Sequence, residues 1–257
     1  MAKVISFSNQ KGGVGKTSTC VNLAAGLALK GKKTLLIDMD PQGNATTGLG
    51  FSKSELTNSV YNVLIDELPA ASAIHKTTLE NLDILPASID LAGAEVELVY
   101  LKNREKRLRE KISAIVDKYD FIMIDCPPSL GLLTINALSA SNSVIIPIQS
   151  EYFALEGLSQ LMNTIRLVVK HLNPELKIEG VVVTMYDGRA LISKQISAEI
   201  HKFFGKTMFN TVIPRNIRVS EAPSHGLPVM LHDPRCTGAK AYVALADEFL
   251  LREGKNN

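Results

Sequence analysis

The sequence predicts a single α/β domain with a mostly parallel, twisted sheet and helices on both faces. Short runs rich in leucine and β-branched residues alternate along the chain with longer amphipathic stretches, and such runs are typical of strands buried on both faces. The chain has 257 residues, of which 46% are hydrophobic and 21% charged, so it can bury a sizeable core. No repeat, low-complexity segment or linker divides it. We therefore expect one domain over residues 1–257, with residues 254–257 as a frayed tail.

Six segments are predicted to be strands because each is a short apolar run bounded by polar or turn-forming residues. The segment Asp120–Asp125, for example, has the sequence Asp-Phe-Ile-Met-Ile-Asp. In chain order the predicted strands are Lys3–Ser8, Lys33–Asp38, Leu82–Pro86, Asp120–Asp125, Ser143–Ile148 and Ile178–Thr184.

The longer stretches between these strands are predicted to be helical. Within Ser193–Phe204, the residues Ile196 and Ile200 fall on one face, as in a helix that packs on a core. Tyr242 and Phe249 likewise share a face of the last helix. The predicted helices are Thr17–Lys30, Arg104–Lys118, Leu155–His171, Ser193–Phe204 and Gly238–Arg252. Because strands that alternate with helices are joined by crossovers, this order favours a parallel sheet.

Composition excludes some functions and leaves others open. The net charge of +2 is too small to indicate nucleic-acid binding by itself. The three cysteines, Cys20, Cys126 and Cys236, are far apart and form no CxxC pair, which fits a reducing compartment better than a disulfide framework or a zinc site. No signal peptide and no apolar run of about 20 residues is evident. We expect a cytoplasmic protein without stable membrane association.

A glycine-rich loop follows the first predicted strand. Residues Asn9–Thr17 have the sequence Asn-Gln-Lys-Gly-Gly-Val-Gly-Lys-Thr, and glycines there let backbone N–H groups approach phosphate oxygens. Lys16 can reach the β- and γ-phosphates, and the Thr17 hydroxyl can ligate Mg²⁺ directly. The strict pattern G-x-x-x-x-G-K-[ST] is not met, because Gln10 stands where its first glycine would be and Lys11 adds a second lysine. The sequence therefore predicts a P-loop NTPase of a variant kind, whose nucleotide-binding residues include Lys11, Gly12, Gly13, Val14, Gly15, Lys16, Thr17 and Ser18.

Acidic residues end two further predicted strands. Asp125 ends one buried strand, which suits a carboxylate that holds Mg²⁺ through water; taken alone, it could equally cap a turn. Asp38 and Asp40 end another strand. Two carboxylates so near a phosphate site would repel it unless they hold metal or water. We expect Asp38 to assist Asp125 at Mg²⁺ through water.

Together these residues resemble the ParA/MinD group of deviant Walker A ATPases, and most of all its ParA/Soj chromosome-partitioning branch. The resemblance covers nearly the whole chain. The segments that carry it are Lys11–Thr17, Asp38–Leu49, Ile124–Asn136 and Val212–Pro228. There are small departures: Ser18 stands where a second threonine is common, and Gly188–Leu191 replaces a more polar stretch.

The resemblance implies a mechanism as well as a fold. In that family two protomers sandwich ATP with Mg²⁺. In that family, the lysine that matches Lys11 reaches the partner's phosphates, and the lysine that matches Lys16 acts on the phosphates of its own protomer. The aspartate that matches Asp40 helps to position the attacking water. Pro214 and Asn216 match the segment that lines the adenine pocket. Hydrolysis is then slow without a partner, the ATP-bound homodimer binds double-stranded DNA without sequence preference, and a ParB-type partition protein stimulates hydrolysis and release. Such a protein is nucleoid-associated when ATP-bound.

Candidate DNA contacts lie in the basic C-terminal part of the chain. Between Met185 and Lys240 there are eight lysines and arginines against four acidic residues. A solvated surface is the default interpretation of such charge, but the resemblance favours DNA binding here. The expected contacts are Arg189 and Arg218, with Lys194 and Lys202 as weaker candidates. A rival basic patch over Lys102–Lys111 contains two glutamates and is expected to be an exposed helix.

Two other functions stay open at this point. One is a MinD-like membrane-surface switch, which would need a basic amphipathic tail, whereas Asp247, Glu248 and Glu253 lie near the end of this chain. The other is a metal-cluster carrier ATPase of related fold, for which the sequence lacks a cysteine pair.

Overall fold

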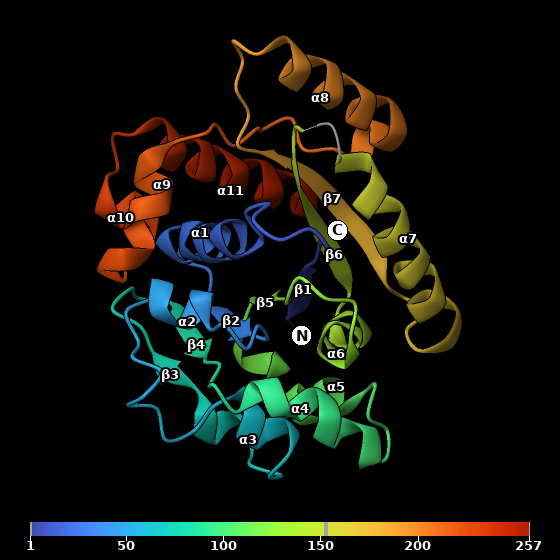
Figure 1. Cartoon of the computed structure of the whole chain (residues 1–257). Helices are drawn as coiled ribbons and strands as arrows, with labels where there is room; N and C mark the ends of the chain where they lie inside the picture. Colours follow the sequence, from blue (N-terminus) through green and yellow to red (C-terminus); the bar gives the residue numbers. More distant parts are fainter. Residues whose placement is uncertain (1, 152–153, 257) are drawn as a thin grey trace.

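A seven-stranded sheet in the order β3-β4-β2-β5-β1-β6-β7 forms the centre of the computed structural model, which describes residues 2–151 and 154–256 (Figure 1). Neighbouring strands are parallel except for β3, which pairs antiparallel with β4. The strands are β1 (Lys3–Phe7), β2 (Thr34–Asp38), β3 (His75–Lys76), β4 (Leu82–Leu85), β5 (Phe121–Asp125), β6 (Ser143–Gln149) and β7 (Lys177–Thr184). The prediction of a mostly parallel sheet in a single α/β domain is confirmed. The two residues of β3 are too few to leave a sequence pattern.

Helices cover both faces of this sheet, as predicted (Figure 1). One face carries α1 (Lys16–Leu29), α2 (Asn44–Gly48), α9 (Ile217–Glu221), α10 (Val229–His232) and α11 (Thr237–Asn256). The other carries α3 (Val60–Leu64), α4 (Leu91–Glu97), α5 (Arg107–Ile112) and α6 (Leu132–Ala140), with α7 (Ala154–His171) and α8 (Leu191–Phe204) packed over β6 and β7. Short 3₁₀ turns lie at Ala70–Ala73, Leu98–Tyr100, Val116–Lys118, Gly205–Thr207 and Ala222–His225.

Alternation along each strand divides the core between the two faces. In β2, Leu36 packs in the cluster that contains α1 and α11, whereas Leu35 and Ile37 pack in the cluster of α3–α6. All five residues of β2 are buried, so the strand shows a continuous apolar run although its side chains alternate between faces.

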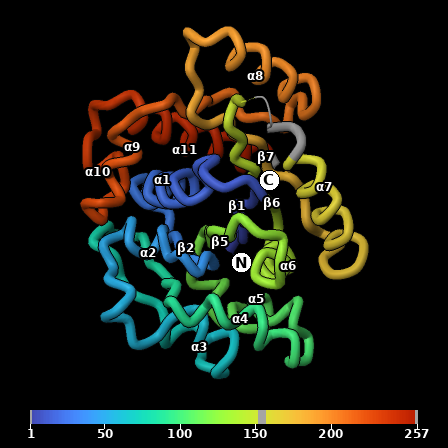
Figure 2. Tube along the Cα trace, viewed as in Figure 1, coloured from blue at the N-terminus to red at the C-terminus, as the bar shows by residue number. Residues whose placement is uncertain are grey.

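The two ends of the chain meet at the edge of the sheet opposite the glycine-rich loop. The Lys3 amine at the start of β1 lies 2.5 Å from a Glu253 carboxylate oxygen and 2.6 Å from one of Glu179. Figure 2 shows α11, in red, running beside α1, in blue. The helix α11 continues to Asn256, through residues where the sequence suggests a frayed tail; Asn257 lies outside the described residues.

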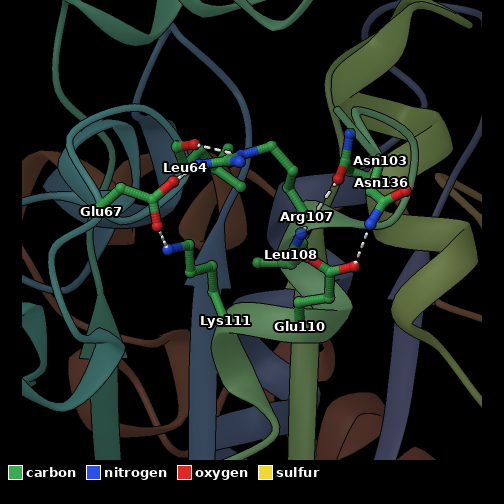
Figure 3. Close-up of polar contacts among 8 residues, drawn as sticks. All are labelled: Leu64, Glu67, Asn103, Arg107, Leu108, Glu110, Lys111 and Asn136. Atoms are coloured by element: carbon green, nitrogen blue, oxygen red, sulfur yellow. Dashed lines mark hydrogen bonds and ion pairs between the residues drawn. The ribbon is translucent and has the colours of Figure 1, made fainter. Parts of the chain in front are cut away.

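The predicted helix over Arg104–Lys118 is wrong in length. The α-helix α5 covers only Arg107–Ile112, and a separate 3₁₀ turn follows. Asn136 of α6 explains where it begins, because its side chain accepts a hydrogen bond from the Leu108 amide (Figure 3). The same side chain donates one to the Arg104 carbonyl. A tertiary contact of this kind overrides local helix propensity.

Candidate nucleotide site

The carboxyl ends of β1, β2 and β5 lie side by side at one edge of the sheet. In the strand register, Asp125 at the end of β5 is paired with Phe7 of β1 and with Asp38 of β2. The glycine-rich loop leaves β1 at this level and leads into α1. Crevices at the carboxyl ends of parallel strands are where open α/β sheets bind ligands.

The loop is held in shape by contacts from two other strands. The Asn9 side chain accepts a hydrogen bond from the Lys11 amide at 3.0 Å and donates one to the Pro147 carbonyl of β6 at 2.8 Å. The Thr184 hydroxyl of β7 donates to the Val14 carbonyl at 2.7 Å. Neither Asn9 nor Thr184 was predicted as a site residue, because their role depends on contacts between distant strands.

Two glycines give the loop its curvature. Gly13 and Gly15 have φ angles of 73° and 81°, which disfavour any residue with a Cβ atom. A Cβ placed on Gly12 or Gly13 would meet no atom within 4 Å, so the space over the loop is open. No side chain caps the N-terminus of α1, and its free N–H groups suit an anion.

The two lysines of the loop differ in burial. Lys16 is buried and its amine donates to the Lys11 carbonyl at 3.2 Å. Burial lowers its pKa, although Asp125, Cys126 and Asp40 act in the opposite direction. The Lys11 amine instead lies outside the loop, 3.2 Å from a Glu151 carboxylate oxygen. Arg215 is on the far side of Glu151, at 3.8 Å.

Asp38 is fully buried but well supplied with donors. One of its oxygens accepts hydrogen bonds from the Thr46 amide and hydroxyl at 2.8 and 2.7 Å, and the other accepts from the Asp40 amide at 3.1 Å. Burial nonetheless raises its pKa to about 6. The Thr46 hydroxyl also accepts from the Ala87 amide after β4. Thr46 therefore fixes Asp38, a role that sequence reasoning missed.

Asp125 has the opposite environment. Neither of its oxygens has a hydrogen-bond partner of normal geometry among the described residues, and the side chain is fully buried. Burial and the charge of Asp38 raise its pKa, while the nearby Thr17 hydroxyl and Lys16 act to lower it. A fully buried carboxylate that lacks well-formed hydrogen bonds and lies near a threonine hydroxyl fits a hydrated magnesium ion. Among the predicted metal-binding residues, Thr17 and Asp125 fit this group best, because the oxygens of Asp38 are already occupied.

Asp40 lies on a tight turn between β2 and α2. Its side chain accepts a hydrogen bond from the Gln42 amide at 2.9 Å, and its carbonyl accepts one from the Gly43 amide at 2.8 Å. The residue is 6% exposed. The turn thus holds a second carboxylate close to Lys16 and Asp125, in agreement with the effect of its charge on both groups.

A cavity of about 210 Å³ adjoins the loop on its C-terminal side. Pro214 and Asn216, both predicted to line an adenine pocket, are in its wall, together with Gly15 and Ser18 of the loop region. Asn216 is held in place, since its side chain donates to the Thr237 hydroxyl and accepts from the Arg218 amide. An apolar wall with a few fixed polar groups is typical of a nucleobase pocket. The remaining lining residues are Thr184, Met185, Ile213, Arg215, Ile217, Val219, Ser220 and Tyr242.

The predicted DNA contacts lie away from this crevice, in two places. Arg189 precedes α8 and its side chain is 94% exposed, 3.2 Å from Asp187; Lys194 and Lys202 are exposed on α8 itself. Lys202 is 2.6 Å from Glu199. Arg218 is on α9, where it contacts Glu221 at 2.8 Å. These acidic partners are at least partly exposed, so they compete only weakly with another anion.

The rival basic patch is not the exposed helix that the sequence suggests. Arg107 is buried; its guanidinium donates to the Leu64 carbonyl and to Glu67, and Lys111 also contacts Glu67 (Figure 3). The hydrogen bonds from Lys111 and Arg107 lower the pKa of Glu67 to about 2. Part of the patch is therefore neutralised within the protein.

Fold, loop and buried carboxylates together define a protein of the P-loop nucleotide-binding class. A family model described as an AAA domain matches residues 2–178. The sporulation initiation inhibitor protein Soj of Bacillus subtilis is 58% identical over 248 residues, which are 96% of this chain and 98% of Soj. The chromosome partitioning protein ParA of Myxococcus xanthus is 51% identical over 98% of this chain and 89% of its own length.

A solved structure with a similar fold supports this assignment. A crystal structure of cobyrinic acid a,c-diamide synthase from Mycobacterium smegmatis, with bound ADP and magnesium, matches with a TM-score of 0.87 and 36% identity over 99% of this chain and 96% of that one. The chain belongs to the Soj/ParA family of AAA-domain proteins. No helix in the described part of the chain is both long and apolar enough to span a membrane.

Proposed function

We propose that this protein is a DNA-partitioning ATPase that hydrolyses ATP to ADP and phosphate with Mg²⁺ as cofactor. The observation that carries the proposal is the division of labour between two lysines of one loop. Lys16 is buried near the carboxylates, whereas Lys11 is half-exposed and its amine pairs with Glu151. Lys16 can bind the phosphates of the nucleotide in its own protomer. Lys11 is placed to bind the phosphates of a second protomer.

Within one protomer, the loop binds and orients the triphosphate. The N–H groups of the loop and of the start of α1 surround the phosphates, and Lys16 offsets their charge from within the protein. Thr17 and Asp125 would hold magnesium, which when bound supplies further positive charge to the phosphate oxygens. Asp40 would orient the attacking water, and the cavity beside Pro214 and Asn216 would take the adenine.

The half-exposed Lys11 supports a dimer that depends on ATP. If it reaches the partner's phosphates, it must first leave Glu151, and the ion pair that it gives up is partly exposed and therefore weak. The γ-phosphate would then favour the dimer over the monomer. Hydrolysis by the monomer alone would be slow, because the charge supplied in trans is missing.

DNA and a partition protein are the remaining partners in this proposal. Paired protomers would present two copies of the basic surface to double-stranded DNA without sequence preference, and a ParB-type protein would stimulate hydrolysis and release. Two relatives carry chromosome-partitioning names, the ParA protein of Myxococcus xanthus and the Soj ATPase of Treponema pallidum, which supports a role on DNA. We expect the protein in the cytoplasm, and on the nucleoid when ATP is bound.

The coupling of ATP to dimerisation can be measured by light scattering with and without Mg·ATP. Wild type should double in mass with ATP. Lys11→Ala should keep part of its nucleotide affinity but lose turnover, because Lys16 still binds the phosphates. A protein that stays monomeric with ATP would contradict the sandwich dimer.

DNA binding is tested with random duplexes across a salt series, in the presence of ATP. Arg189→Ala and Arg218→Ala should each weaken binding to unrelated sequences equally and reduce the salt slope by roughly one unit per lost phosphate contact. ATP turnover without DNA should change little. Lys111→Met is the matched control, because that lysine is already paired with Glu67. Wild-type affinity in both arginine variants would mean that the DNA surface lies elsewhere.

A further inference from the structure

Lys53 lies outside every segment discussed so far, yet its side chain crosses the turn that carries Asp40. Its amine is 2.6 Å from the Gln42 carbonyl oxygen. Its methylene stem covers Gly43 so closely that a Cβ on that glycine would lie 2.6 Å from the Lys53 Cδ. One side chain therefore contacts two successive residues of the turn.

The other hydrogen bonds of the Asp40–Gly43 turn are few. Its inner end is fixed by the Asp40 amide, which donates to Asp38, and its internal bonds run from Gln42 and Gly43 back to Asp40. Gly43 has a φ of 60° and is the residue at which α2 begins, without a side-chain cap. The outer end is held by two contacts: the Gly43 carbonyl accepts from the Thr47 amide and hydroxyl at 3.0 and 3.2 Å, and the Gln42 carbonyl accepts from the amine of Lys53.

The segment just before Lys53 is packed on the core. Phe51, two residues earlier, is partly buried against the hydrophobic cluster under α1, and its ring meets His75 edge to face at 5.8 Å. The Phe51 amide donates to the Thr46 carbonyl of α2. The side chain of Lys53 thus connects a segment packed on the core to the turn after β2.

We propose that Lys53 is a positioning residue that fixes the Asp40 turn for hydrolysis. This inference rests on the proposed function in that Asp40 orients the water. Small displacements of such a group are costly for rate, because misplacement by about 1 Å can lower it by up to about a hundredfold. Nucleotide affinity depends on other residues, namely the loop and Lys16, so it should not follow the rate.

The test compares three variants of the full-length protein. Lys53→Met keeps the stem over Gly43 but loses the donor, Lys53→Arg keeps a donor, and Lys76→Met removes an exposed lysine of β3 whose amine contacts Asp83 at 2.9 Å. Lys53→Met should lower kcat for ATP about tenfold, with ATP affinity within about twofold of wild type. Lys53→Arg should recover most of the rate, and Lys76→Met should match wild type throughout.

Hydrogen exchange of the nucleotide-free protein separates this inference from the proposed function. The Gln42 and Gly43 amides should exchange several-fold faster in Lys53→Met than in wild type or Lys76→Met, because the turn opens more often. Unchanged exchange and turnover in Lys53→Met, or a loss in Lys53→Arg as large as in Lys53→Met, would overturn the inference. Full turnover in Asp40→Ala would instead refute the proposed role of Asp40, while faster exchange would still support the contact made by Lys53.

Discussion

Two clusters of charged side chains in this protein are built in opposite ways. At the nucleotide edge, Asp38 and Asp125 are fully buried next to each other, and burial raises the pKa of both. On α5, Arg107 and Lys111 both contact Glu67 and lower its pKa to about 2. The first cluster places like charges together, and the second places each charge beside its opposite.

The difference shows which cluster is completed by a ligand. Like charges in a buried place lower stability unless a cation joins them, so natural proteins keep them where function needs them. Asp125, without a hydrogen-bond partner of normal geometry in the described part of the chain, is the clearest case. The α5 cluster needs no ligand to hold it together, because Glu67 pairs with both cations and the Leu64 carbonyl accepts a hydrogen bond from the Arg107 Nε. We infer that it serves folding.

The two clusters should differ most in ATP affinity when one lysine is removed from each. Lys16→Ala should lose ATP affinity by roughly a hundredfold, since the buried phosphates lose a charge-assisted hydrogen bond inside the protein. Calorimetric titration with Mg·ATP measures it. Lys111→Met should bind ATP as wild type does. Equal losses in the two variants would mean that the effect is on folding rather than on the site.

Asp125→Asn should reduce activity and increase stability together. Magnesium-dependent turnover should collapse, while the nucleotide-free, metal-free protein becomes more stable at pH 7.5, by about 3 kcal/mol if the full cost of an unpaired buried charge is relieved. The sign follows from the raised pKa of Asp125. The folded wild type resists its ionisation, so this group costs stability as pH rises above the carboxyl's ordinary value.

The gain should therefore shrink from pH 7.5 to pH 4.5, because the raised pKa of Asp125 favours the protonated carboxyl in the folded protein as the pH falls. Urea unfolding of wild type and Asp125→Asn at the two pH values tests this. A gain that does not change with pH would point to packing instead of charge. Arg109→Met, which changes an exposed residue of α5, controls for surface effects.

Local pattern was enough to predict six of the seven strands, the glycine-rich loop and the acidic strand ends. Continuous apolar runs specified β1, β2 and β5; Lys16 and Thr17 were found in the glycine-rich loop that follows β1, and Asp125 at the end of β5. What pattern missed depends on contacts between distant segments. The start of α5 is set by Asn136 of α6, and Asp38 is held by the amide and hydroxyl of Thr46. Such partners have no fixed spacing in sequence, so only the folded chain brings them together.

The smallest effect should come from the α5 cluster, and it should appear in stability alone. Arg107→Met removes the donor to the Leu64 carbonyl at 2.7 Å and leaves that buried acceptor without its partner, at a cost of about 1–3 kcal/mol. Lys111→Met removes only the second contact to Glu67, which is exposed, so it should cost less than about 1 kcal/mol. Urea unfolding gives both values, and ATP binding should stay at the wild-type level in each. If Arg107→Met unfolds no more easily than Lys111→Met, the buried carbonyl finds another donor; if it loses ATP affinity, the two clusters are coupled through α6 and the contrast between them does not hold.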